Sequence, residues 1–180
     1  MMRTNYNNWP SDGQSVDQQR DALAGTSGAD GAAFTAALAA GPASSAFDKR
    51  TGVSVRLHRV SSNIGNAQSV SLFTDANERN KVGAMTVAPG RNSLRILSIE
   101  NLGRSRYKGV GTAMIEVADH TRQSAGLSKL SLLSQDEGAS AFFYKKGFRF
   151  ADEGKNAEMR TVISNPRYVS DEILMGEMER

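Results

Sequence analysis

The stretch LRILSIENLGRSRYKGVGTAMIEVADHTRQSAG, residues 94–126, decides the fold. Its first six residues are mostly apolar and predict a strand that is buried on both faces. From Val110 onward the apolar residues recur at helical spacing, which predicts a helix that ends at Gly126, where glycine can adopt the left-handed cap conformation. A strand, a basic turn with glycines and a helix, in this order, are typical of a site that binds an anion at the helix N-terminus.

The turn itself has the spacing Arg106-x-x-Gly109-x-Gly111. Two glycines let backbone N–H groups approach a phosphate closely, and the neighbouring Arg104 and Lys108 add positive charge. The alternative is that the glycines only connect a strand to a helix, as in any α/β chain. A P-loop is excluded because no Gly-Lys-Ser/Thr follows, and the fingerprint of dinucleotide-binding folds is also absent.

A second motif follows at residues 136–148, which read DEGASAFFYKKGF and predict a short helix ending on a glycine. Together with the glycine turn, this motif resembles the Gcn5-related N-acetyltransferase (GNAT) superfamily. Members of that family hold the pyrophosphate of acetyl-coenzyme A in a Q/R-x-x-G-x-G/A loop and carry a later motif that reads roughly N-x-x-A-x-x-F-Y-x-K-x-G-F. The resemblance covers about the second half of the chain, residues 94 to 163.

Alternating apolar and polar residues predict strands on both sides of this region, at residues 53–60, 68–74, 81–87, 93–99 and 129–134. They indicate an α+β (mixed α/β) fold whose central mixed sheet combines an antiparallel meander with a splayed parallel pair, flanked by helices. This is the GNAT-like sheet, with one departure. Family members usually place one or two helices between the first two strands, where this chain has only residues 61–67. We therefore expect an open acceptor side, or one completed by the leader or a partner.

The 180 residues divide by composition into three parts. Residues 1–48 are rich in Asn, Gln, Ser, Ala, Asp and Gly and predict a disordered polar leader, in which residues 29–40 are the one candidate helix. Residues 49–164 are expected to form the acetyltransferase-like domain and to end in a hairpin at residues 148–151 and 159–164. Residues 165–180 are expected to be a tail or a short amphipathic helix.

Composition also narrows the class of protein. The chain has no cysteine, no apolar run of the length needed to cross a membrane, and no basic-then-apolar secretory signal. These features predict a cytoplasmic protein, although the polar leader is also compatible with non-Sec secretion of an effector. The net charge is +3, and the leader has five aspartates against two arginines, so the positive charge lies in residues 49–180 and favours anionic ligands. Nucleic acid is a less favoured partner, because acidic residues are interleaved with the basic ones.

The resemblance implies acetyl-coenzyme A as co-substrate and an amine as acceptor, either on a protein or on a small molecule. It implies no metal, and no residue spacing suggests a metal site. The backbone at the end of the fourth family strand would pair with the pantetheine arm, and the glycine loop would bind the pyrophosphate. The predicted cofactor-binding residues are Ile99, Glu100, Asn101, Arg106, Tyr107, Lys108, Gly109, Val110, Gly111, Thr112 and Phe143.

The catalytic residues are harder to assign. Many family members have a tyrosine acid at the position that aligns with Phe143, and Tyr144 lies one residue later, rotated by about 100° around the helix. Either Tyr144 reaches the thiolate, or water supplies the proton, or the protein binds coenzyme without catalysis. Glu100 is the first candidate for the general base, with Asp136 and Glu137 as alternatives. Two functions stay open: an acetyl-coenzyme A-dependent N-acetyltransferase, and a catalytically inactive coenzyme-binding or protein-interaction module. The sequence does not indicate the oligomeric state.

Overall fold

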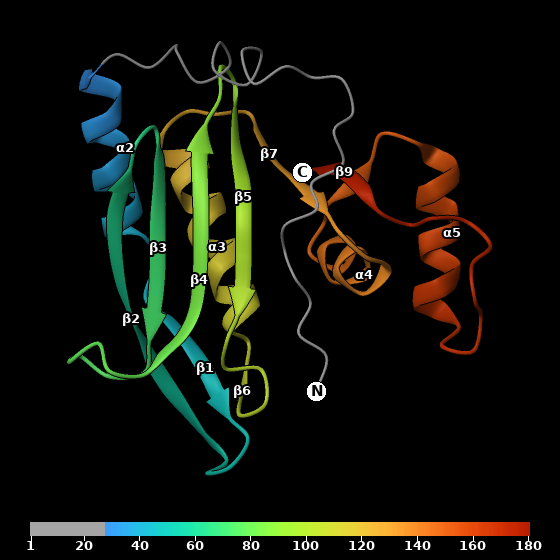
Figure 1. Cartoon of the computed structure of the whole chain (residues 1–180), viewed down its shortest axis with the longest axis horizontal. Coiled ribbons are helices and arrows are strands. Elements are labelled where there is room, and N and C mark those ends of the chain that lie inside the picture. Colours follow the sequence, from blue (N-terminus) through green and yellow to red (C-terminus); the bar gives the residue numbers. More distant parts are fainter. Residues whose placement is uncertain (1–27) are drawn as a thin grey trace.

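The computed structural model describes residues 28–180, which form a nine-stranded mixed sheet with helices packed against it (Figure 1). The strands follow the spatial order β6-β1-β2-β3-β4-β5-β7-β9-β8. All adjacent strands are antiparallel except β5 and β7, which are parallel. The predicted fold class, an antiparallel meander joined to a parallel pair, is confirmed.

The meander consists of β2 (Val53–Ile64), β3 (Ala67–Phe73), β4 (Lys81–Pro89) and β5 (Ser93–Asn101). The tightest connection is between β2 and β3, where Gly65 has a φ of 59° that few other residues tolerate. The predicted strands are present, and β2 continues four residues beyond its expected end. The prediction that β5 is buried on both faces is wrong, because Arg95 and Leu97 are exposed while Leu94 and Ile96 are buried.

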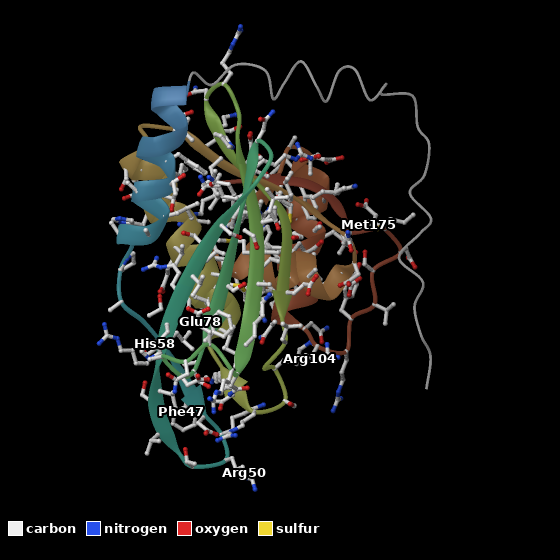
Figure 2. All side chains as sticks on the ribbon, turned by 60° about the vertical axis from the view of Figure 1, so that its left-hand side comes forward. Phe47, Arg50, His58, Glu78, Arg104 and Met175 are labelled. Carbon is white, nitrogen blue, oxygen red and sulfur yellow. The ribbon has the colours of Figure 1, made fainter. Side chains whose placement is uncertain are left out.

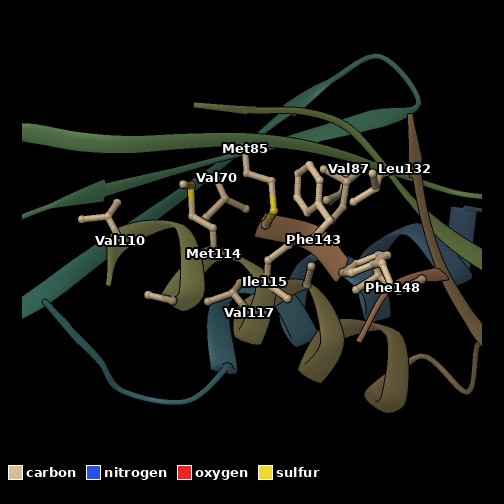
Figure 3. Packing of buried hydrophobic residues seen from close by; sticks show 14 of the residues in the cluster. Val70, Met85, Val87, Val110, Met114, Ile115, Val117, Leu132, Phe143 and Phe148 are labelled. Carbon is tan, nitrogen blue, oxygen red and sulfur yellow. The ribbon is translucent and has the colours of Figure 1, made fainter. Parts of the chain in front are cut away.

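Helix α3 (Val110–Ser124) connects β5 to the parallel strand β7 (Lys129–Ser134) and packs against the sheet. Its buried residues are those that the helical period predicts, including Val110, Met114 and Val117. Gly126 has the positive φ expected at the end of the helix. Figure 3 shows Met114 and Val117 beneath the strands that carry Val70, Met85 and Val87, so one apolar layer lies between helix and sheet.

Two elements lie in the segment that was expected to be a disordered leader. Helix α2 (Gly28–Ala40) packs beside α3, and strand β1 (Ser44–Asp48) pairs with β2 and with β6 (Tyr107–Lys108). The candidate helix at residues 29–40 is thus confirmed, whereas the prediction that residues 28–48 belong to a disordered leader is wrong. Phe34 and Leu38, four residues apart on one helix face, are 4% and 0% exposed and bury more apolar surface than the alanine-rich composition suggests. Residues 1–27, the rest of the predicted leader, lie outside the described residues.

The C-terminal part also differs from the prediction. After α4 (Glu137–Lys145) and the short strand β8 (Arg149–Phe150), residues 153–164 form helix α5 (Glu153–Ser164), where a hairpin strand was expected. Asp152 caps this helix, since its carboxylate accepts hydrogen bonds from the N–H groups of Gly154 and Lys155.

The predicted C-terminal helix is replaced by β9 (Gly176–Glu179), which lies between β7 and β8. Met178 faces the core at 1% exposure, whereas Glu177 and Glu179 face outward. The two glutamates form ion pairs with Arg95 and Lys129 across the sheet. This alternation of inward and outward side chains is typical of a strand. The helical spacing of Ile173, Leu174 and Met178, which predicted a helix, is therefore misleading here.

Candidate coenzyme site

The site is built where the two parallel strands separate. β5 pairs with β7 only from Ser93 to Ile96, opposite Lys129 to Leu132. Beyond this point β7 continues beside β9, and the last five residues of β5 are not paired with β7. The edge of β5 that faces away from β4 is therefore open from Leu97 to Asn101, as predicted for a splayed pair.

A β-bulge marks the point of separation. Val87 of β4 lies opposite Ile96, while the preceding Thr86 lies opposite Ser98, so Leu97 has no cross-strand partner. Leu97 is 52% exposed. Because a bulge bends its strand and increases the local twist, it turns the end of β5 away from β7.

The three residues predicted to line the coenzyme arm lie on this open edge. Ile99 is partly buried against the core, and Glu100 and Asn101 are exposed. On one side they pair with Met85, Ala84 and Gly83 of β4. Their other side can receive an extended chain that pairs with the backbone as an additional strand would.

The N-terminus of α3 lies at the end of the turn that follows β5. Gly109 precedes the helix with a φ of 101°, a conformation that strongly favours glycine. No side chain caps the helix, and its first turn has no acidic residue. The first N–H groups of a helix have no partner within it, so this end of α3 offers donors and positive potential to an anion.

The turn is held in place by an ion pair that the sequence analysis missed. Nε and Nη2 of Arg106 donate to one oxygen of Asp48, at 3.0 and 2.7 Å. Asp48 is 2% exposed, and this side-chain pairing lowers its pKa from 3.8 to about 2. The sequence of β1 gives no signal that Asp48 is buried, since the apolar Phe47 beside it is exposed, and nothing in the sequence links Asp48 to Arg106, 58 residues away.

Two of the residues predicted to bind phosphate thus contribute to the structure of the turn. Arg106 is engaged by Asp48, and Tyr107 is 6% exposed, with its backbone paired to β1. The side chains of Arg104 and Lys108 are exposed near the turn, and Figure 2 shows Arg104 at its outer side. These two side chains are exposed and form no ion pair among the described residues, so their positive charges are available to a ligand.

Gly111 has a packing role in addition to the predicted one. A Cβ atom at this position would lie 3.0 Å from Cζ of Phe142, so the aromatic ring of α4 rests on the first turn of α3. Phe142 was not among the predicted site residues. Val110, also predicted, is fully buried and packs below the turn, while Thr112 is partly exposed in the first turn.

The side chains of Phe143 and Tyr144 lie in different surroundings. Phe143 is 5% exposed and stacks edge to face on Phe142 and Phe148, at centroid distances of 5.2 and 5.7 Å. Tyr144 is 8% exposed, with Arg149 3.9 Å above its ring and its hydroxyl 3.4 Å from Nη1 of Arg160. The structure therefore places the Tyr144 hydroxyl against α5.

The three candidates for the general base lie in different places. Asp136 caps α4 by accepting a hydrogen bond of 2.7 Å from the N–H group of Ala139, which gives it a structural function. Glu137 is exposed in the first turn of α4. Glu100 is exposed on the open segment of β5, next to Ile99, and is the candidate that lies within the predicted donor slot.

The face of the sheet opposite α3 is open. Gly83 faces Val110 and Met114 of α3, so the next residue, Ala84, faces the other way, in a row with Ser71 and Glu100. A second row on the same face of the sheet consists of Ser69, Thr86 and Ser98. Figure 1 shows α3 behind β4 and β5, and within residues 28–180 no helix lies in front of them. Only Gly65 and Asn66 separate β2 from β3, so the predicted absence of helices between these strands is confirmed, and an open acceptor side stays a prediction.

Residues 28–180 contain neither a group of metal-binding side chains nor a helix that could span a membrane. No group of three His, Cys, Asp or Glu side chains in residues 28–180 could hold a metal ion. None of the helices in this part of the chain is long and apolar enough to cross a membrane.

Comparison with known proteins gives distant matches. No protein-family model matches the chain. An uncharacterized protein of Bacillus subtilis, YdhI, is 25% identical over 131 residues, which cover 66% of this chain and 81% of YdhI. Nourseothricin acetyltransferase is 17% identical, with a TM-score of 0.46 and coverage of 86% of this chain and 94% of that one. Tetrahymena GCN5 is 18% identical, with a TM-score of 0.42 and coverage of 64% and 68%. These likenesses are distant, and function is inferred below from the site itself.

Proposed function

We propose that the chain is an acetyl-coenzyme A-dependent N-acetyltransferase, which transfers an acetyl group to an amine of a protein or small molecule. The observation that carries this proposal is the meeting of two features at one place. The unpaired edge of β5 from Leu97 to Asn101 leads directly into the turn that ends at the uncapped N-terminus of α3.

These two features match the two chemical parts of the donor. The pantetheine arm has amide groups that pair with an open strand edge, here the backbone of Ile99, Glu100 and Asn101. The pyrophosphate is an anion that suits the N–H groups of Gly109 to Thr112 at the start of α3, with Lys108 and Arg104 as exposed cations. Arg106 and Tyr107 support this arrangement by fixing the turn to β1.

The reaction needs a base because an ammonium group with a pKa of about 10 must lose a proton before its nitrogen can attack. Glu100 is the proposed base, acting directly or through water. The amine nitrogen then forms a bond to the thioester carbonyl carbon, and the bond from that carbon to sulfur breaks. The acetyl group is then on nitrogen, the electron pair of the broken bond is on the thiolate sulfur, and the nitrogen loses its remaining extra proton to water.

The thiolate must finally gain a proton. Tyr144 was predicted as one source, but its hydroxyl lies against Arg160 of α5, and Phe143 has no proton to give. We therefore propose that water protonates the thiolate, a step that need not limit the rate because coenzyme A thiolate is a tolerable leaving group.

A second candidate function is a coenzyme-binding module without catalysis. The observation that favours it is the occupation of the usual tyrosine position by Phe143, buried in the aromatic cluster with Phe142 and Phe148. Both functions require the donor site, and only the first requires turnover.

Two measurements on the full chain test these proposals. Calorimetry with coenzyme A is expected to show binding, weaker in Lys108→Gln than in the matched exposed control Arg91→Gln. Release of free thiol from acetyl-coenzyme A, followed with a thiol-reactive dye over a panel of amines and peptides, is expected to depend on the acceptor. Binding without thiol release from any acceptor favours the second function. No binding at millimolar coenzyme A refutes both.

A further inference from the structure

A polar pocket of about 390 Å³ lies at the connection between α2 and β1, on β2, which is three strands from β5 in the sheet. Its lining includes residues 41–43 of this connection and Arg56, His58 and Arg59 of β2. Leu57 and Leu72 contribute apolar surface to its lining. Figure 2 shows His58 on β2 near this connection. The volume is within the range of small-molecule sites.

Arg59 is the unusual residue of this pocket. Its Nη2 atom donates hydrogen bonds to the backbone carbonyls of Gly41 and Pro42, at 2.6 and 3.2 Å. Its Nε and Nη1 atoms are buried and have no hydrogen-bond partner. Among the described residues, no carboxylate forms an ion pair with Arg59. Burial accordingly lowers the pKa of the guanidinium from its ordinary value, although an arginine stays charged at neutral pH.

This arrangement is costly if its purpose is only to hold the connection. Burying a donor without a partner costs about 1–3 kcal/mol, and more for a charged group. The carbonyl contacts use only Nη2 and leave the N–H groups of Nε and Nη1, which lie on different sides of the guanidinium, without acceptors. Carboxylate and phosphate oxygens are the acceptors that guanidinium N–H groups bind most strongly.

We propose that this pocket binds a small molecule through an oxyanion group, a carboxylate or a phosphate, with Arg59 as the anchoring residue. Arg56 and His58 also line the pocket, but the strand period places their side chains on the other face of β2, so the positive charge offered to the ligand is that of Arg59. The backbone of Gly41 covers Nη1, since a Cβ atom there would lie 2.3 Å from it. Binding therefore involves a small movement of the guanidinium or of the connection, which brings a free N–H group to the ligand.

The test uses the full chain, with inorganic phosphate and succinate as separate probes for the two oxyanion classes. Calorimetry and thermal unfolding are performed on wild type, Arg59→Gln, Arg59→Lys and the exposed control Arg91→Gln. We expect at least one probe to bind wild type and Arg91→Gln equally, and to bind Arg59→Gln roughly 10- to 100-fold more weakly, as for the loss of a charge-assisted hydrogen bond. Arg59→Lys keeps the charge without the fork and is expected to be intermediate.

A second set of variants separates this pocket from the coenzyme site, which could also hold phosphate. Binding at the pocket is expected to persist in Lys108→Gln and in the presence of saturating coenzyme A. Gly41→Ala, which displaces Nη1 without removing the charge, is expected to change the affinity for the probe but not for coenzyme A. The proposal is overturned if neither probe binds wild type, or if Arg59→Gln binds both probes as wild type does. Loss of probe binding in Lys108→Gln alone also overturns it, because the probe then occupies the coenzyme loop.

Discussion

Gly109 offers the sharpest test of the coenzyme site, because a matched glycine lies at the other end of the same helix. Gly109 has a φ of 101° and Gly126 a φ of 68°, so an alanine at either position is held in a conformation that L-residues disfavour. A Cβ atom added at either position would have few neighbours. At Gly109 the nearest atom would be the carbonyl oxygen of Ser45 at 3.9 Å, and at Gly126 no atom of the described residues would lie within 4 Å. Each substitution therefore isolates backbone strain.

The expected loss of stability is similar for the two variants. A left-handed backbone conformation costs an L-residue about 1–2 kcal/mol, partly offset by about 0.4–1 kcal/mol because alanine has fewer conformations than glycine in the unfolded chain. Urea unfolding should thus show each variant destabilised by about 1 kcal/mol. Circular dichroism and an unchanged denaturant slope would establish that both keep the fold.

Coenzyme affinity should separate the two variants. Gly109 sets the direction of the first N–H groups of α3, and relaxation of its strained φ turns these groups away from a bound phosphate. We expect Gly109→Ala to bind coenzyme A at least about 10-fold more weakly, equivalent to about 1.4 kcal/mol, while Gly126→Ala binds as wild type does. Equal affinities for wild type and both variants would refute the assignment of the pyrophosphate to this helix end.

Three other predictions concern the stability of the fold and the role of Tyr144 as a proton donor. Arg106 lowers the pKa of Asp48 to about 2. The contribution of Asp48 to the unfolding free energy is therefore present above pH 4 and is lost as the pH falls from about 4 to 2. Urea titrations across this range should show that Asp48→Asn removes this part of the pH dependence. Leu38→Ala should lower the unfolding free energy by about 2–5 kcal/mol, against about 0.5 kcal/mol or less for the exposed control Ala36→Ser; equal, small losses would show that α2 is not part of the core. Tyr144→Phe should change the rate of thiol release less than about twofold, because its hydroxyl faces Arg160; a loss of about 100-fold would identify Tyr144 as the acid.

The elements that the sequence predicted correctly are those with a strong local period. Residues 81–101 alternate and residues 110–124 repeat at helical spacing, and the structure follows both patterns. The glycine turn was likewise visible, because only glycine readily adopts the φ of Gly109. Local periodicity thus placed the sheet, the helix α3 and the turn of the candidate site.

Two errors have their physical origin in contacts between distant residues. Asp48 is buried by pairing with Arg106, and β9 is a strand because it pairs with β7, more than forty residues earlier. These partners cannot be read from the segments themselves. Residues 159–164 were predicted as a strand of a terminal hairpin, whereas the Asp152 cap begins a helix that continues through them, and this cap is a local signal that the prediction missed.

The two glycines of the turn also show that one motif serves two physical purposes. Gly109 is required for its backbone angle, whereas Gly111 leaves room for Phe142, whose ring would lie 3.0 Å from an added Cβ atom. Phe142 stacks on Phe143, which stacks on Phe148 at the start of the last strands. Because packed aromatic rings transmit displacement rather than absorb it, α4 and the first turn of α3 form one mechanical unit. Helix α4, which carries Phe143 and Phe142, therefore positions the turn that is proposed to hold the donor.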